Sequence, residues 1–213
     1  LNPNLVGKAL GLNVKEGFPI PSLVAPRPPK LCDGCPHIDS YTALNEAMKS
    51  FPGGRVFSDI GCYTLGALPP FQAIYSTVDM GASITMAKGA SEADLLPSVA
   101  VIGDSTFTHS GMTGLLDCCV DNANVTVIIL DNGITGMTGS QKSSATGRIE
   151  SICTGLGVDP AHIRVINPLK KYFEENVAIM KEEIAYKGVS VIIPRRECIV
   201  ALNKRLKAAK KAQ

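Results

Sequence analysis

The chain has 213 residues, of which 45% are hydrophobic and 19% are charged, and its formal net charge is +2. This length allows one domain with its own core, and the composition argues against disorder. The nearly balanced charge gives no support for nucleic acid as a partner, and no apolar run reaches the ~18 residues of a membrane span. No basic region followed by an apolar block marks a secretory signal, so we expect a cytoplasmic protein. Seven scattered cysteines fit reduced thiols or metal ligands better than disulfides.

The two ends of the chain differ in composition from its middle. Residues 1–30 hold six prolines and no periodic apolar face, which predicts an extended Pro-rich linker. Short apolar runs and helical periods alternate from there on, so we expect one folded domain over residues 31–200. Basic side chains gather in residues 201–213, which predicts a basic tail, either a solvated helix or the start of a connector.

Helical and strand patterns alternate through the predicted domain. In chain order we expect a helix over Ser40–Lys49, a strand over Arg55–Ser58, a helix over Ala82–Ala93, a strand over Ser98–Ile102, a helix over Gly111–Val120, a strand over Val125–Leu130, a short helix, a strand over Ile163–Ile166, a helix over Leu169–Tyr186 and a strand over Val189–Ile193. Strands of continuous Val and Ile character between helices predict an α/β fold, with a mostly parallel sheet covered by helices on both faces. Such sheets bind ligands at the carboxyl ends of their strands.

Two of the predicted strands end in polar turns. Gly103-Asp104-Ser105 follows one strand and Asp131-Asn132 follows the next, with 25 residues between Ser105 and Asp131. If the two strands are neighbours, Asp104 and Asn132 point into one crevice. Carboxylate and amide oxygens suit Mg²⁺, whose remaining positions go to phosphate oxygens and water. Gly103 lets the backbone approach a ligand closely, and a helix beginning near Gly111 would add N–H donors for phosphate.

The segments around these turns resemble a known family. The two turns resemble the Gly-Asp-Gly and Asn-Asn motifs of thiamine-diphosphate enzymes, with Ser105 and Asp131 as departures. Four segments resemble indolepyruvate:ferredoxin oxidoreductase large subunits, which are 2-oxoacid:ferredoxin oxidoreductases: residues 59–66 (DIGCYTLG), 79–83 (DMGAS), 103–114 (GDSTFTHSGMTG) and 130–141 (LDNGITGMTGSQ). The resemblance covers about Leu31 to Cys198 and implies a thiamine-diphosphate-binding fold.

The resemblance implies a site for thiamine diphosphate and Mg²⁺. The family's protein ligands for the metal fall on Asp104, Asn132 and the carbonyl of Ile134. The residues that the resemblance assigns to cofactor binding are Gly61, Cys62, Gly103, Asp104, Ser105, Asn132, Ile134 and Thr138. His109 lies in a motif loop and is the candidate catalytic residue, in contact with substrate or diphosphate; a structural role for it stays open.

The segment Cys32-Asp33-Gly34-Cys35-Pro36-His37 contains a C-x-x-C pair. Such a pair has three interpretations: a redox dithiol, half of a zinc site, or two ligands of an iron–sulfur cluster. The chain has no second C-x-x-C for zinc, and a Pro-rich linker is an unusual lead-in to a thioredoxin-like dithiol. The resemblance implies a [4Fe–4S] cluster held by Cys32, Cys35, Cys62 and Cys198. We expect core packing for Cys118, Cys119 and Cys153.

The resemblance also implies an activity and partners. The expected reaction is oxidative decarboxylation of an aryl 2-oxoacid (indolepyruvate) with coenzyme A, giving acyl-CoA, CO₂ and reduced ferredoxin. In this family, the glutamate that activates thiamine belongs to a separate pyrimidine-binding domain, and no such motif is recognisable in this chain. We therefore expect an enzyme that needs this domain and a small (gamma-type) subunit, in a hetero-oligomer, and a chain that is inactive alone.

Two other functions compete with this interpretation. Gly103-Asp104-Ser105 fits the nucleophile block of GDS-type serine hydrolases, and Asp159 and His162 mimic the Asp-x-x-His of those enzymes. That block normally opens its domain, whereas here it follows about 100 residues. A non-catalytic zinc or iron–sulfur interaction module would bind metal without affinity for thiamine diphosphate.

Overall fold

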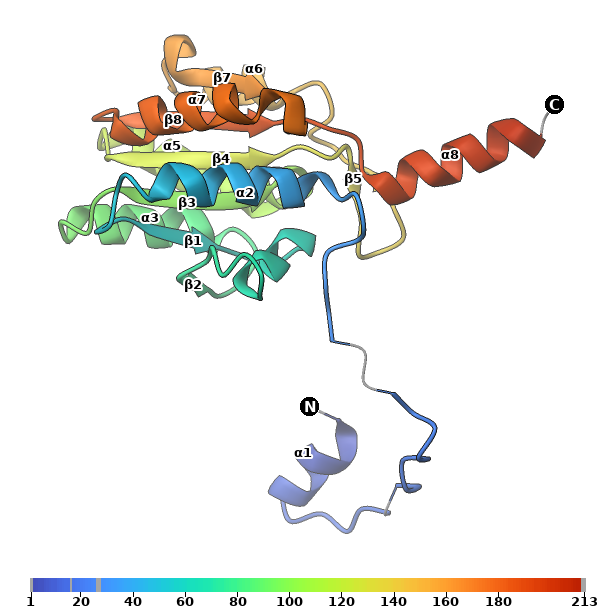
Figure 1. The fold of residues 1–213 in the computed structure, drawn as a ribbon. Helices are drawn as coiled ribbons and strands as arrows, with labels where there is room; N and C mark the ends of the chain where they lie inside the picture. The colour runs from blue at the N-terminus through green and yellow to red at the C-terminus, as the bar shows by residue number, and fades with distance from the viewer. Residues whose placement is uncertain (1, 16, 26–27, 212–213) are drawn as a thin grey trace.

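The computed structural model describes residues 2–15, 17–25 and 28–211. Within these residues, six parallel strands form one sheet with helices on both faces (Figure 1), so the predicted α/β fold is confirmed. Across the sheet the order is β2-β1-β3-β4-β8-β7. The strands are β1 (Arg55–Ser58), β2 (Ser76–Thr77), β3 (Ser98–Gly103), β4 (Val125–Leu130), β7 (Ile163–Ile166) and β8 (Val189–Pro194).

The central strands are buried on both faces, as their continuous apolar sequences require. Every residue of β3, β4 and β8 is buried. Successive side chains of a strand point to opposite faces, so Ala100 and Ile102 join one half of the core and Val99 and Val101 join the other. β-Branched residues suit this pleated, enclosed surface.

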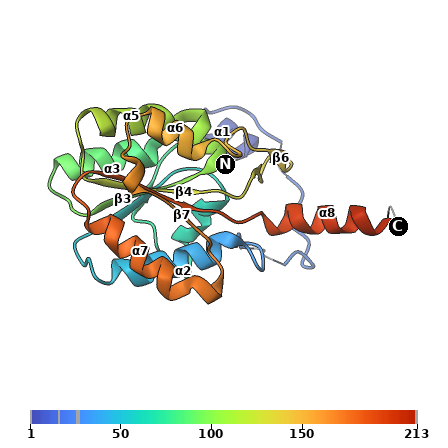
Figure 2. The ribbon, with the colours of Figure 1, turned by 90° about the horizontal axis from the view of Figure 1, so that it is seen from above.

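Each face of the sheet has its own layer of helices (Figure 2). Helices α3 (Ala82–Glu92), α5 (Met112–Val120) and α6 (Ile149–Gly155) cover one face and share its core. Helices α2 (Pro36–Met48) and α7 (Phe173–Ala185) pack against each other over the opposite face. Ala87 in α3 is fully buried, and small side chains like this one let a helix pack closely on the sheet.

The helix that follows β3 begins earlier than the sequence indicates. A short α-helical turn, α4 (Asp104–Thr106), starts directly after the strand and continues through a π-helical turn (Phe107–Gly111) into α5. The predicted helix Gly111–Val120 corresponds to α5, but the helical turns before it were not predicted, because the π-helical turn hides the 3.6-residue period there. The consequence is that the first turn of the helix lies at Asp104 itself.

Three other elements differ from expectation. Helix α2 begins at Pro36 rather than Ser40, because proline is well suited to the first helical position. The short edge strand β2 and the 3₁₀ turn Cys62–Ala67 after β1 have no periodic pattern and were not predicted. The polar loop after β4 contains a small antiparallel hairpin of β5 (Ile134–Thr135) and β6 (Gln141–Lys142).

The predicted linker and tail both contain helix. Within the linker, where extended chain was expected, α1 (Pro3–Ala9) is capped by the Asn2 side chain, which accepts from the Leu5 N–H. Residues 1, 16, 26 and 27 of that linker and residues 212 and 213 of the basic tail lie outside the described residues. The tail is helical in α8 (Ile199–Lys211), which projects from the carboxyl edge of the sheet (Figure 1). The domain boundaries themselves remain predictions.

None of the helices in the described parts of the chain combines the length and apolar character that a membrane span requires.

Candidate functional site

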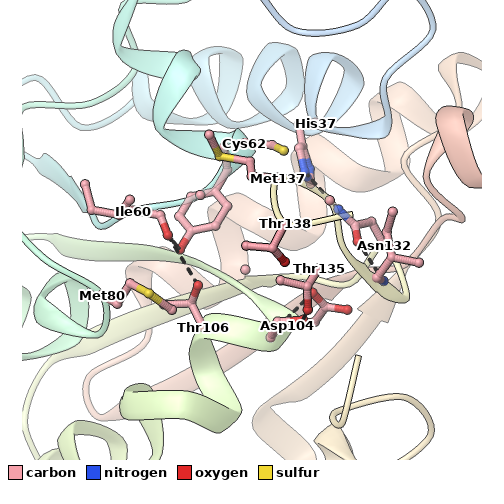
Figure 3. Close-up of a pocket in the computed structure, with 16 residues that line it drawn as sticks. His37, Ile60, Cys62, Met80, Asp104, Thr106, Asn132, Thr135, Met137 and Thr138 are labelled. Atoms are coloured by element: carbon pink, nitrogen blue, oxygen red, sulfur yellow. Dashed lines mark hydrogen bonds between the residues drawn. The ribbon is translucent and has the colours of Figure 1, made fainter. Parts of the chain in front are cut away.

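A cavity of about 270 Å³ opens at the carboxyl edge of the sheet. The chain leaves β1 for the edge strand β2 and returns to β3 on the other side of β1, which creates a crevice where ligands bind in parallel sheets. The loops after β1, β3 and β4 supply the walls, as Figure 3 shows. Among the residues assigned to cofactor binding in the sequence, all eight line this cavity: Gly61, Cys62, Gly103, Asp104, Ser105, Asn132, Ile134 and Thr138.

Asp104 is a buried carboxylate on the wall of this cavity, with a side chain held by backbone groups. Its Oδ1 accepts the Ser105 N–H at 2.7 Å and its Oδ2 accepts the Gly133 N–H at 3.0 Å. Burial, with the nearby Asp131 carboxylate, raises the pKa of Asp104 to about 6 despite these hydrogen bonds. In the described part of the chain, no Lys, Arg or His forms a salt bridge with Asp104.

Asn132 faces Asp104 across the cavity, and its amide has a contact at each end (Figure 3). The amide oxygen accepts the Ile134 N–H at 3.0 Å, and the amide nitrogen lies 3.3 Å from Nε2 of His37. His37 is 2% exposed, and this burial lowers its pKa to about 4. The imidazole is therefore neutral at physiological pH and accepts from the Asn132 amide.

Tyr63 forms the floor between the loops after β1 and β3. Its ring lies against Gly61 and Gly103, where an added Cβ would overlap the ring. Its hydroxyl donates to Asp59, whose other oxygen accepts from the Ser83 hydroxyl at 2.7 Å. Burial, foremost, raises the pKa of both Asp59 and Tyr63. This network holds the loop after β1 against the start of α3.

Hydroxyl groups gather beside the first turn of the helix at Asp104. Thr135 donates to the Ser105 hydroxyl at 2.8 Å, and Thr108 lies 2.8 Å from the Ser144 hydroxyl. The helix N-terminus adds partial positive charge. Together, these groups form an environment suited to phosphate oxygens.

A second cavity, of about 200 Å³, lies beside the first and is lined by all four cysteines that were assigned to an iron–sulfur cluster. Burial, followed by a smaller effect of the neighbouring thiols, raises the pKa of Cys35 to about 11, and the same two causes raise the pKa of Cys62. Cys118 and Cys153 lie away from this cavity, in the core under α5 and α6, and Cys119 packs against that core, consistent with the expected packing role.

Six residues line both cavities: His37, Cys62, Asn132, Ile134, Gly136 and Met137. A Cβ added at Gly136 would lie 3.3 Å from the Cys62 sulfur, so glycine allows this loop to approach the thiol. Within the described residues, no three His, Cys, Asp or Glu side chains are arranged to hold a single metal ion. A lone zinc ion draws its thiolates to within about 2.3 Å of itself, whereas these four thiols surround a larger space.

Two residues of the motif loops lie elsewhere than the sequence implies. His109 is exposed in the π-helical turn, bonds to the Ser110 hydroxyl at 3.1 Å and does not line the cavity, so its catalytic role stays a prediction. Asp131 points to Arg195 at 2.6 Å, and Arg195 also binds Glu150. Asp131, which stands where the family has Asn, thus forms an ion pair with Arg195 and does not point to the metal position.

The hydrolase alternative is inconsistent with the geometry. Ser105 follows β3, at the carboxyl edge of the sheet, whereas Asp159 and His162 precede β7, at the amino edge. His162 bonds to Glu183 at 2.9 Å, and Asp159 caps a 3₁₀ turn by accepting the Ala161 N–H. A serine and a histidine at opposite ends of parallel strands cannot act as nucleophile and base on one substrate.

Three residues of the site could not be identified as functional from the sequence. His37 was noted only as part of the cysteine motif, and Asp59 and Tyr63 only as letters of a matching segment. A buried hydrogen bond between residues 95 positions apart, as between His37 and Asn132, leaves no periodic signal in the sequence. Pro36 favours the start of a helix, which places His37 in the first helical turn. This was the one sequence signal that bears on the position of this buried side chain.

Comparison with known proteins matches residues 59–193 to the family described as thiamine pyrophosphate enzyme, C-terminal TPP binding domain. The chain is 35% identical over 214 residues to indolepyruvate oxidoreductase subunit IorA of Archaeoglobus fulgidus, covering 92% of this chain and 34% of the relative. It is also 35% identical, over 225 residues, to the subunit IorA of Pyrococcus horikoshii, covering 91% and 34%. The chain thus spans about a third of the length of the relatives it matches.

Solved structures share the fold. A 2-oxoglutarate:ferredoxin oxidoreductase from Magnetococcus marinus, with 2-oxoglutarate, coenzyme A and succinyl-CoA bound, superimposes with a TM-score of 0.67 at 17% identity, over 82% of this chain and 66% of that one. A putative thiamin diphosphate-dependent enzyme from Mycobacterium smegmatis gives a TM-score of 0.57, also at 17% identity, over 74% and 31%.

Proposed function

Because this chain belongs to the thiamine pyrophosphate enzyme family, C-terminal TPP binding domain, we propose that it is the thiamine-diphosphate- and Mg²⁺-binding part of a 2-oxoacid:ferredoxin oxidoreductase. One observation carries the proposal. The cavity with the candidate metal ligands and the cavity with four cysteines lie side by side and share six residues. A cofactor that accepts an electron pair and a cluster that removes electrons singly need this proximity.

The donor set fits Mg²⁺ bound to a diphosphate. Asp104 is a buried carboxylate with a raised pKa, and a divalent cation would restore its charged form. The Asn132 amide oxygen and the Ile134 carbonyl would complete the protein ligands. The helix start at Asp104 and the hydroxyls of Ser105, Thr135 and Thr138 would bind phosphate oxygens.

The cysteine cavity fits a [4Fe–4S] cluster. Each iron of such a cluster takes one thiolate, so four cysteines around one cavity are the required complement. Burial raises the pKa values of Cys35 and Cys62. Iron would reverse this effect, because a coordinated thiol loses its proton.

The proposed reaction converts an aryl 2-oxoacid, such as indolepyruvate, and coenzyme A into acyl-CoA and CO₂. The bond between the keto carbon and the carboxylate breaks, a bond to the coenzyme A sulfur forms, and one proton is released. The two electrons of this oxidation leave to two oxidised ferredoxins. Thiamine diphosphate supplies the electron sink for the decarboxylation, while this chain's residues bind its diphosphate, hold the metal and exclude water.

The remaining parts of the enzyme belong to the same proposal. A pyrimidine-binding domain would supply the activating glutamate, and a small (gamma-type) subunit would complete a hetero-oligomer in the cytoplasm. His109 is proposed to contact substrate from its exposed turn after these parts assemble. The chain alone would bind the cofactor weakly and would not turn over substrate.

Anaerobic reconstitution with iron and sulfide tests the proposal. We expect about four irons per chain, with loss of the cluster in Cys62→Ser and retention in the matched variant Cys153→Ser. Cys153 is buried in the core away from the cavity and serves as the control for removal of a thiol. Zinc in place of iron, or equal iron content in the two variants, would reject the cluster and leave a thiamine-diphosphate domain without an electron path.

A further inference from the structure

His37 lies between the two cavities and touches a candidate ligand of each. It is the second residue of α2, directly after Pro36. Cys35, a candidate cluster ligand, is the N-cap residue of the same helix. Nε2 of His37 lies 3.3 Å from the amide nitrogen of Asn132, a candidate metal ligand.

The hydrogen bond to His37 determines which way the Asn132 amide faces. An asparagine amide has one end that only donates and one that only accepts. The amide nitrogen of Asn132 lies at Nε2 of His37, and because this nitrogen only donates, Nε2 is the acceptor. The oxygen then points to the opposite side, where it accepts the Ile134 N–H. The reversed amide would set N–H against N–H at Ile134 and an oxygen lone pair against the Nε2 lone pair at His37, so the two contacts together keep the metal-binding oxygen on the ligand side.

The same loop contacts two more candidate cluster ligands. The Cys198 N–H donates to the Asn132 carbonyl at 3.1 Å. Gly136, four residues after Asn132, approaches the Cys62 sulfur closely. A cluster that fixes Cys35, Cys62 and Cys198 would therefore also fix the loop that presents Asn132 and Ile134. Because binding couplings are reciprocal, a metal–diphosphate complex that orders this loop would also favour the cluster.

We propose that His37 is a positioning residue that holds the Asn132 amide oxygen toward the metal and links it to the cysteine loop, so that cofactor binding and cluster binding strengthen each other. This inference rests on the function proposed above. In this role His37 acts through Asn132 and through the helix start that carries Cys35.

The test is the affinity for thiamine diphosphate at saturating Mg²⁺, measured by titration calorimetry on the full chain with and without its reconstituted cluster. In the unsubstituted chain we expect the cluster to lower the dissociation constant about 5-fold or more, the lower range of typical couplings. In His37→Leu we expect this ratio to fall to near 1. His37→Gln should restore it, because the glutamine oxygen reaches the place of Nε2 and accepts the same N–H.

Two further variants keep the test decisive. Thr42→Ala changes an exposed side chain on the same helix and should keep the full ratio. If His37→Leu does not fold, His37→Met removes the acceptor with an unbranched side chain that adapts to the core. A ratio near 1 in the unsubstituted chain with both groups bound, or an undiminished ratio in the Leu or Met variant, overturns the inference. Absence of iron or of Mg²⁺-dependent binding in the unsubstituted chain overturns the proposed function, and the inference with it.

Discussion

The two edges of the sheet each bury a carboxylate, and the two carboxylates differ in their partners. At the amino edge, Glu183 is 1% exposed and lies 3.1 Å from Arg164 and 2.9 Å from His162. At the carboxyl edge, Asp104 is 2% exposed and bonds to backbone N–H groups, with a pKa raised to about 6. A buried acid paired with a cation such as Arg164 is part of the stable fold, whereas a buried acid without one is suited to a cation that arrives from solution.

The largest effect that we expect from a substitution at either edge is on ligand binding at the carboxyl edge. Asp104→Ala removes the one carboxylate of the proposed metal site, so we expect the dissociation constant for thiamine diphosphate with Mg²⁺ to rise about 100-fold, roughly 3 kcal/mol. Titration calorimetry measures this change. Affinity within 3-fold of the unsubstituted chain would show that the metal is bound elsewhere.

The matched change at the amino edge should affect the fold and not the ligand. Glu183→Gln keeps the shape of the side chain but removes the charge that Arg164 and His162 meet. We expect a loss of about 2 kcal/mol in the free energy of unfolding, since one member of a buried ion pair loses its partner. Urea denaturation gives this value, and cofactor affinity in the folded fraction should stay within 2-fold. An unchanged unfolding midpoint would mean that the Glu183 charge adds nothing to stability.

The raised pKa of Asp104 makes the stability that this group contributes at the carboxyl edge depend on pH. The folded pKa of about 6 lies above the ordinary value of 3.8, so folded chains bind the proton more tightly than unfolded ones between these values. Without metal, this group therefore adds stability as pH falls from above 6 toward 4, by about 2.5 kcal/mol. Mg²⁺ competes with that proton, so cofactor affinity should weaken over the same fall in pH.

Unfolding free energies of the unsubstituted chain and Asp104→Asn, compared from pH 7 to pH 4, measure this contribution. The difference between the two chains should change by about 2.5 kcal/mol across the range, because the neutral amide has no proton to take up. A constant difference would show that Asp104 has an ordinary pKa.

The smallest expected effect concerns the hydroxyls beside the helix start. Ser105→Ala removes the acceptor of the Thr135 hydroxyl and one candidate phosphate donor. We expect about 3-fold weaker binding of thiamine diphosphate, the scale of one partly exposed hydrogen bond. Calorimetry on Ser151→Ala, which removes an exposed hydroxyl of α6 that does not line the cavity, provides the control. Equal affinity in the two variants would remove Ser105 from the phosphate site.

The sheet could be predicted from sequence where strands are long and buried. Val125–Leu130, which is buried throughout, was predicted with the bounds that the structure has, because a run of β-branched residues carries a strong local signal. β2 and the 3₁₀ turn at Cys62 were missed, since they are short and depend on tertiary contacts. The helical turns from Asp104 to Gly111 were missed, because a π-helical turn disrupts the 3.6-residue period that marks a helix.

The candidate site could be predicted only as far as motifs reach. Asp104 and Asn132 follow adjacent strands, and the order of elements was enough to bring them to one crevice. The Cys32–Cys35 loop and Cys198 line one cavity because α2 and the end of β8 meet at the carboxyl edge, which spacing alone does not reveal. The contact of His37 with Asn132 depends on a helix start and a loop 95 positions apart, so only the folded chain brings it into view.

The most direct test of the proposed cofactor site is the binding of thiamine diphosphate to the unsubstituted chain. Calorimetry measures this binding with Mg²⁺ and again with the divalent cation removed by a chelator. We expect saturable binding with one cofactor per chain. This binding should be lost, or weakened at least 10-fold, without Mg²⁺, because Asp104 then faces the diphosphate as an uncompensated acid. Binding of equal strength with and without the cation, or no binding at any concentration of Mg²⁺, would contradict the proposed cofactor site.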